Sequence, residues 1–365
     1  MHLRKFPPAG LALILSLAIA APVFAQSGEN KDYTAIQDER DARKLKSLIE
    51  DFVSKYPSSG HRPEVDFKLM GLYSDNKDLA QMLKHADSFA LTQGAASNTD
   101  KSKFFTLAME AARQLGSQNK MTEFADRALM ADPNNISVLM TMARTLSENP
   151  PNDAAGRTAA IDKALGYATK AQNATKPEKT ADAEWQAAQG RLHGILGLIY
   201  FTKGSAATET SAKNELIGQA ANEFSEYLKK NPTDGLGQYR YGLAVFNQLQ
   251  GTLATLQSVQ ADAIKAHNAG DAEKVDVYAE RLTKLTAQFE LQRDTIIDAM
   301  AKALAIGGPY ATQAHQIIDP LFKQKHNTQT LEALDPYIQQ KKTEMTALAP
   351  LPAPTVSAPR PPAGK

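Results

Sequence analysis

From Lys44 to about Glu344 the chain repeats one pattern, in which apolar residues recur at steps of three and four. Such steps place apolar side chains on one side of an α-helix, and most residues between them are good helix formers. The alternating pattern typical of β-strands is missing from this stretch. Short clusters rich in proline, asparagine and glycine interrupt the pattern at residues 56–60, 132–135, 149–152 and 231–235. Because these residues favour turns, we expect an all-α fold built of many helices.

The predicted helices recur at a regular spacing. Within Ser102–Asn135 the large and small residues that set the pattern are Phe105, Ala108, Ala112, Ala128 and Pro133. Ala143 follows ten residues after Pro133, where a second repeat of the same length would place a small residue. A second unit has the same order, with Leu196, Gly197, Tyr200, Ala220, Phe224 and Pro232, and Gly242 again follows ten residues after the proline.

This spacing resembles that of the tetratricopeptide repeat, a helix–turn–helix unit of about 34 residues. Tyr227 departs from the family pattern, because a small residue is usual at that position. The resemblance implies four or five repeats over residues 44–248, stacked as an α-solenoid with a concave groove. It also implies that the protein binds other proteins. Because the sequence contains no recognisable catalytic or phosphate-binding motif, we expect no catalytic residue and no cofactor.

The family register also indicates which side chains face the groove. In the unit that starts at Gly190 they are Arg191, Gly194, Leu198 and Phe201, and in the unit that starts at Gly235 they are Leu236, Tyr239, Leu243 and Phe246. A groove lined in this way suits an apolar peptide or helix of a protein partner. The alternative is that some of these residues belong to the core between repeats.

After residue 248 the spacing changes. We expect a long helical hairpin over residues 249–306, with one helix starting near Leu249 and a turn at Gly270-Asp271. Its second helix carries a coiled-coil-like seam of Val275, Tyr278, Leu282, Leu285 and Phe289. Capping helices are expected over residues 307–348. The proline-rich residues 349–365 predict a disordered extension, which is either a spacer or a ligand for another protein.

The N-terminus predicts export. Basic residues precede an apolar run over residues 11–21, and small residues surround a cleavage site after Ala25. This layout is typical of a secretory signal peptide, here residues 1–25, and the run is too short to span a bilayer. An uncleaved anchor is the alternative. A linker is expected over residues 26–43. Because the chain has no cysteine, we expect neither disulfides nor a lipid anchor. The signal peptide predicts a periplasmic or secreted protein.

The charge balance and the missing metal-ligand motifs argue against two classes of function, nucleic-acid binding and metal binding. The chain has 41 basic and 40 acidic residues and no basic stripe, which argues against nucleic-acid binding. The histidines stand singly, without the spacing of metal ligands, so no metal site is expected. Trp185 is expected either to pack between repeats or to anchor a partner.

These patterns predict a non-catalytic scaffold or assembly adaptor of the bacterial cell envelope. One alternative is a structural protein that self-associates through a hairpin at residues 249–304. A less favoured alternative is a helical glycan-cleaving enzyme with paired carboxylates.

Overall fold

The computed structural model describes residues 28–92, 96–178 and 180–348. Within these ranges the chain consists of helices and short links and contains no strand, which confirms the predicted all-α fold there. The expected signal peptide and the expected C-terminal extension lie outside the described residues. The chain divides into two compact units, Met1–Met142 and Ala143–Lys365, and each has its own core.

The first unit is a run of helices in which sequence neighbours pack together. After a helical segment at residues 28–38 come α2 (Ala42–Lys55), α3 (Arg62–Asp75), α4 (Leu79–Thr92), α5 (Asn98–Gln114) and α6 (Gln118–Ala131). The next helix, α7 (Ile136–Glu148), spans the division between the units. Phenylalanine rings fill the centre, where Phe89 stacks on Phe104 with ring centroids 3.9 Å apart. Such large buried rings supply much of the unit's apolar burial.

The start of the first unit differs from the expected linker over residues 26–43. Residues 28–38 are helical, and Ile36 is fully buried. Tyr33 stacks on His61 with ring centroids 3.8 Å apart and donates a hydrogen bond to Glu64. The segment therefore packs on α3 as a further helix, because its apolar side finds a partner there.

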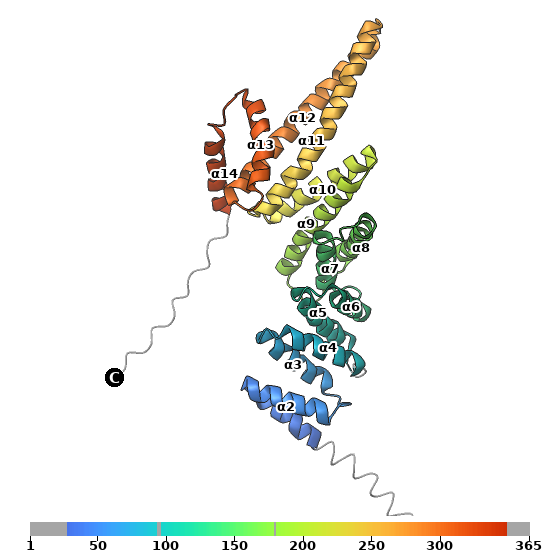
Figure 1. Cartoon of the computed structure of the whole chain (residues 1–365), viewed down its shortest axis with the longest axis vertical. Helices are drawn as coiled ribbons and strands as arrows, with labels where there is room; N and C mark the ends of the chain where they lie inside the picture. The colour runs from blue at the N-terminus through green and yellow to red at the C-terminus, as the bar shows by residue number, and fades with distance from the viewer. Residues whose placement is uncertain (1–27, 93–95, 179, 349–365) are drawn as a thin grey trace, which may run out of the picture. The chain divides into compact units, whose positions relative to one another are not determined.

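The second unit continues with longer helices (Figure 1). They are α8 (Ala154–Asn173), α9 (Asp182–Ala206), α10 (Thr210–Lys230), α11 (Gly235–Asn268), α12 (Ala272–Ile306), α13 (Ala311–His326) and α14 (Leu334–Leu348). Each helix from α8 to α12 packs on the next one in sequence, and α14 packs on α12. α11 and α12 form the long hairpin.

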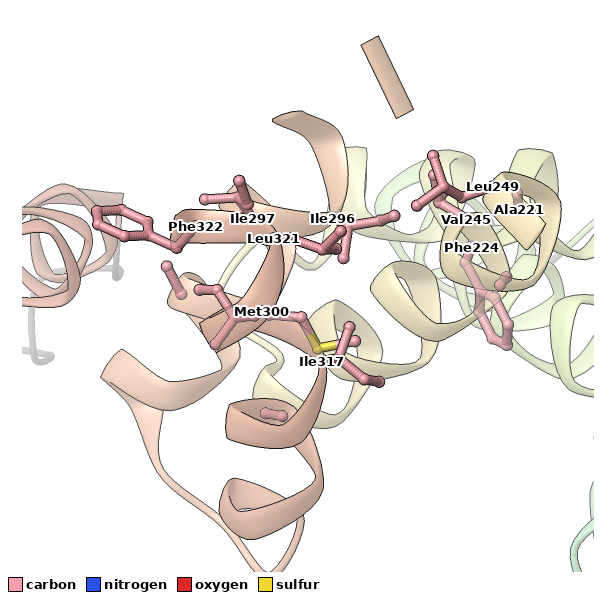
Figure 2. Close-up of a cluster of buried hydrophobic side chains, with 14 of the residues drawn as sticks. Ala221, Phe224, Val245, Leu249, Ile296, Ile297, Met300, Ile317, Leu321 and Phe322 are labelled. Atoms are coloured by element: carbon pink, nitrogen blue, oxygen red, sulfur yellow. The ribbon is translucent and has the colours of Figure 1, made fainter. Parts of the chain in front are cut away.

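The core of the second unit lies where the hairpin meets its neighbours. Figure 2 shows Phe224 of α10, Val245 of α11, Met300 of α12 and Phe322 of α13 in one apolar cluster, and all four are buried. The cluster joins five helices, α10 to α14. It therefore anchors the end of the hairpin at which α11 begins and α12 ends.

Two helices are longer than the sequence predicts. α11 begins at Gly235 rather than near Leu249, so the expected boundary between repeats and hairpin falls inside one continuous helix. Its first turn is capped by Asp234, whose carboxylate accepts a hydrogen bond from the Leu236 amide (3.1 Å). α9 likewise continues to Ala206, through most of residues 202–208, a stretch rich in glycine, serine, alanine and threonine that the repeat pattern predicts to lie between two helices.

Glycines end the helices of the hairpin. Gly270 lies in the expected turn with φ +71°, and Gly307 ends α12 with φ +84°. A residue with a β-carbon is strained at such angles, so glycine is favoured at both positions. Asp271 caps the start of α12 by accepting a hydrogen bond from the Lys274 amide (3.2 Å).

Candidate partner-binding face

Glycines line the side of α9 that packs on α10. They are Gly190, Gly194, Gly197 and Gly204. A β-carbon at Gly197 would lie 2.7 Å from Cδ1 of Phe224, and one at Gly204 would lie 2.9 Å from Cδ1 of Ile217. Both distances are too short for carbon atoms in contact, so the side chains of α10 rest directly on the backbone of α9.

Tyr227 of α10 joins three helices. Its ring lies against Gly194 of α9 and Gly237 of α11, where added β-carbons would come within 3.0 Å and 2.8 Å of ring atoms. Its hydroxyl donates a hydrogen bond to Oδ2 of Asp234 (2.6 Å), the residue that caps α11. Burial, and then this hydrogen bond, raise the pKa of Tyr227 well above its usual range. The link from α10 to α11 is thus fixed by packing and by a hydrogen bond.

The predicted groove residues of α9 differ in exposure. Arg191 is exposed, whereas Leu198 and Phe201 are half-buried and pack against the core cluster. Gly194 does not face a groove, because the Tyr227 ring covers it. The family register placed it wrongly because that register assumes a small residue at position 227.

The predicted groove residues of α11 are mostly packed against the same core. Tyr239 stacks on Tyr310 with ring centroids 5.1 Å apart and planes 12° apart. Leu243 and Phe246 are half-buried against the core cluster. Leu236 is 41% exposed and offers the freest apolar side chain of the set.

We call this set the α9/α11 face, and its members are Arg191, Leu198, Phe201, Leu236, Tyr239, Leu243 and Phe246. The two helices that carry it are in contact with each other. Five of the set, Leu198, Phe201, Tyr239, Leu243 and Phe246, pack against the same core cluster, and of the set only Arg191 and Leu236 are exposed.

Polar groups beside this face are already paired. Nδ1 of His193 on α9 lies 2.6 Å from Oε2 of Glu223 on α10. Burial, and then the negative charge of Glu223, raise the pKa of the neighbouring Tyr200. The His193–Glu223 pair was not predicted, since its members lie 30 residues apart in the sequence. Within the described ranges, no three His, Asp or Glu side chains gather in a way that would hold a metal ion.

A buried charged cluster in the first unit also escaped prediction. Arg62 donates two hydrogen bonds to Asp66, at 3.3 Å from Nε and 3.2 Å from the terminal nitrogen. Nε2 of His85 lies 3.3 Å from Oδ1 of Asp66 but lacks the alignment of a hydrogen bond. The His85 ring packs edge-on against Phe104. The cluster links α3 to α4. Its only signal in the sequence was that Arg62 and Asp66, two residues of opposite charge, lie four residues apart on a helix side that is otherwise apolar.

Trp185 is half-buried in the first turns of α9.

In the described part of the chain, no helix combines the length and the apolar character needed to cross a bilayer. No protein-family model matches the chain, and no curated protein matches its sequence.

Proposed function

We propose that this chain is a non-catalytic scaffold of the cell envelope that binds an apolar peptide or helix of a partner protein. The binding surface is the α9/α11 face. The observation that carries the proposal is Leu236 of α11, which is 41% exposed, while Leu243 and Phe246 of the same helix are half-buried against the core cluster. The tetratricopeptide-like spacing and the expected signal peptide support the repeat fold and the envelope location.

The chemistry of the face defines the partner. Half-buried leucine and phenylalanine side chains release more water when a partner covers them, at about 25 cal/mol for each Å² of apolar surface. Arg191, on the same helix as Leu198 and Phe201, is exposed. We therefore expect a partner segment with apolar side chains on one side and a carboxylate placed to pair with Arg191.

The nearby polar groups support the rigidity that the proposed binding surface needs. His193 is held by Glu223, and the Tyr227 hydroxyl is held by Asp234. Each of these contacts joins two helices, so the pairs act as parts of the scaffold.

Site-specific photo-crosslinking in the producing cells tests the proposal. A photoreactive residue replaces Leu236 in one variant and Met130 in the control, because Met130 is 83% exposed on α6, outside the face. We expect a discrete adduct from position 236 that position 130 does not give. Arg191→Glu in the first variant should weaken that adduct at least tenfold.

Both variants should keep the helical circular dichroism of the parent, since the substituted side chains are exposed. If positions 236 and 130 give the same adducts, or if Arg191→Glu leaves the adduct unchanged, the α9/α11 face is not the binding surface.

A further inference from the structure

Exposed apolar side chains gather at the end of the α11–α12 hairpin where α11 begins and α12 ends. Leu236, in the first turn of α11, and Ile306, the last residue of α12, are each 41% exposed. Leu236 follows Gly235 in the chain, and Ile306 packs against that glycine, since an added β-carbon there would lie 3.0 Å from Cγ2 of Ile306. Neighbouring exposed apolar side chains, unlike single ones, mark binding surfaces.

Two tyrosines complete this surface. The Tyr310 hydroxyl lies so close to Gly235 that no β-carbon would fit between them. The Tyr310 ring stacks on that of Tyr239, with centroids 5.1 Å apart. Tyr239 lies three residues after Leu236 and hence on the same side of α11. We call this surface the end patch, and its members are Leu236, Tyr239, Ile306 and Tyr310.

The end patch carries no charge. Burial raises the pKa of Tyr239, and burial followed by the negative charge of Asp234 raises the pKa of Tyr310. Both hydroxyls are therefore uncharged at neutral pH. The Asp234 carboxylate itself already accepts hydrogen bonds from the Tyr227 hydroxyl and the Leu236 amide. The patch thus suits an apolar segment without acidic residues.

α13 leads the chain away from the end patch. It starts next to Tyr310, and Lys325 in its last turn pairs with Asp294 of α12 (3.0 Å). Asp294 precedes Ile306 by about 18 Å along the helix axis, at 1.5 Å for each residue. α12 and α13 therefore run in opposite directions.

α14 brings the chain back towards the end patch. Tyr337, near the start of α14, contacts Phe322 in the last turns of α13, with ring centroids 5.9 Å apart. One turn later, Lys341 pairs with Asp298 of α12 (2.8 Å). The contacts of α14 thus move towards the C-terminal end of α12, and Figure 1 shows α14 ending at the end of the hairpin where α11 begins. Its last residue, Leu348, is 58% exposed.

The composition of the following residues suits the end patch. Residues 349–365 include six prolines and no acidic residue. Proline-rich segments bind apolar and aromatic surfaces at low entropic cost, because proline restricts the backbone before binding. Residues 349–354 alone can span about 19 Å at 3.1 Å for each residue, so the segment is long enough to reach the patch from the end of α14.

We propose that residues 349–365 bind to the end patch of their own chain. Leucine and proline side chains at positions 350–354 then cover the exposed surfaces of Leu236 and Ile306. Because the segment is joined to α14, its local concentration at the patch is on the order of millimolar. A contact too weak to hold a free peptide is therefore occupied within the chain.

This binding regulates the α9/α11 face, and that consequence rests on the proposed function. Leu236 and Tyr239 belong to both surfaces, so residues 349–365 and the partner peptide compete for the same side chains. Deleting residues 349–365 should strengthen the adduct from a photoreactive residue at position 236 at least threefold. An unchanged adduct contradicts the competition.

Photo-crosslinking in purified residues 26–365 tests the binding itself. A photoreactive residue replaces Ile306 in one variant and Val277 in the control, because Val277 is 60% exposed near the other end of α12. After illumination and proteolysis, mass spectrometry of the monomer should find position 306 linked to residues 349–365. Position 277 should not give this link.

A second substitution separates binding from mere proximity. Adding Leu236→Glu to the position-306 variant should lower the yield of the link at least fivefold, because it places a charge in the patch. Adding Met130→Glu, at a side chain that is 83% exposed on α6, should leave the yield unchanged. A link that is absent, that occurs only in crosslinked dimers, or that survives Leu236→Glu overturns the proposal. Since these experiments use purified protein without a partner, the binding and the proposed function can fail separately.

Discussion

The two ends of the α11–α12 hairpin have the same spacing of apolar residues, but their apolar side chains are buried to different extents. We call residues 235–250 and 292–306 the hairpin base. In the base, Ile296 and Met300 are fully buried, because α10, α13 and α14 cover the outer sides of the pair. We call residues 251–268 and 272–291 the hairpin tip. In the tip, the seam residues Leu282 and Leu285 remain half-buried. The spacing thus shows which residues face a neighbouring helix, but not how many helices share that contact.

Ion pairs show the same contrast. In the base, Asp298 of α12 lies 2.8 Å from Lys341 of α14, and Asp294 lies 3.0 Å from Lys325 of α13. In the tip, the ion pairs lie within one helix or its cap, and they are Lys265–Asp262, Lys274–Asp271 and Lys284–Glu280. Charges in the base hold separate helices together, whereas charges in the tip support single helices.

The largest expected effect compares equivalent seam positions at the two ends. Ile296→Ala should lower the free energy of unfolding by about 3 kcal/mol, because it leaves a cavity in a fully covered core. Leu285→Ala should cost only about 1 kcal/mol, since its side chain already contacts water and the site can relax. Urea unfolding of residues 26–365, followed by circular dichroism, measures both.

The outcome that contradicts this comparison is an equal loss at both positions. If Leu285→Ala costs as much as Ile296→Ala, the tip is as well covered as the base, and the contrast between them is wrong.

A smaller effect is expected from two tyrosines. Tyr227→Phe keeps the ring between Gly194 and Gly237 but removes the hydrogen bond to Asp234, which should cost about 1 kcal/mol. Tyr278→Phe is the control in the tip, where the Tyr278 ring is half-buried. That change should stay within about 0.5 kcal/mol. Thermal unfolding of both variants beside the parent measures the difference, and equal losses would show that the hydroxyl of Tyr227 contributes nothing.

Tyr227 also shows where sequence reasoning reached its limit. The spacing correctly predicted helices and turns, because apolar periodicity and turn residues act locally. It treated Tyr227 as a departure from the repeat pattern. The structure shows the compensation, since Gly194 and Gly237 lack the side chains that would otherwise fill the space of the ring. Tyr227 and these two glycines come together only in the folded chain, so the sequence pattern alone does not show that the large side chain fits against the small ones.

The candidate site was predictable only in outline. Residue type and register placed Leu243 and Phe246 on an apolar side of α11, but their half-burial depends on α12 to α14, which follow later in the chain. The same holds for Asp298, whose lysine partner lies 43 residues away on α14. Helix length was underestimated for α11 because the repeat pattern alone set the expected boundary, although no proline lies between Gly235 and Leu249 to end a helix.

The smallest expected effect concerns the Asp298 ion pairs of the base. Burial by itself would raise the pKa of Asp298, but hydrogen bonds and charge attraction from Lys302 and Lys341 outweigh it, so the net pKa is lowered. A carboxylate whose pKa is lower in the folded state stabilises the fold above its ordinary pKa. That stability is lost as the pH falls through the folded-state value. Asp298→Asn should therefore cost less than about 1 kcal/mol at neutral pH, because the pair is partly exposed.

At a pH below the folded-state pKa, the parent and Asp298→Asn should have the same unfolding free energy, since the parent carboxylate is then also uncharged. Asp276→Asn in the tip is the matched control, and it should not alter stability at either pH. Urea unfolding at neutral and acidic pH separates these cases. A constant difference between Asp298→Asn and the parent at both pH values would mean that packing, rather than charge, joins α14 to the base. The base would then differ from the tip only in how many helices cover it.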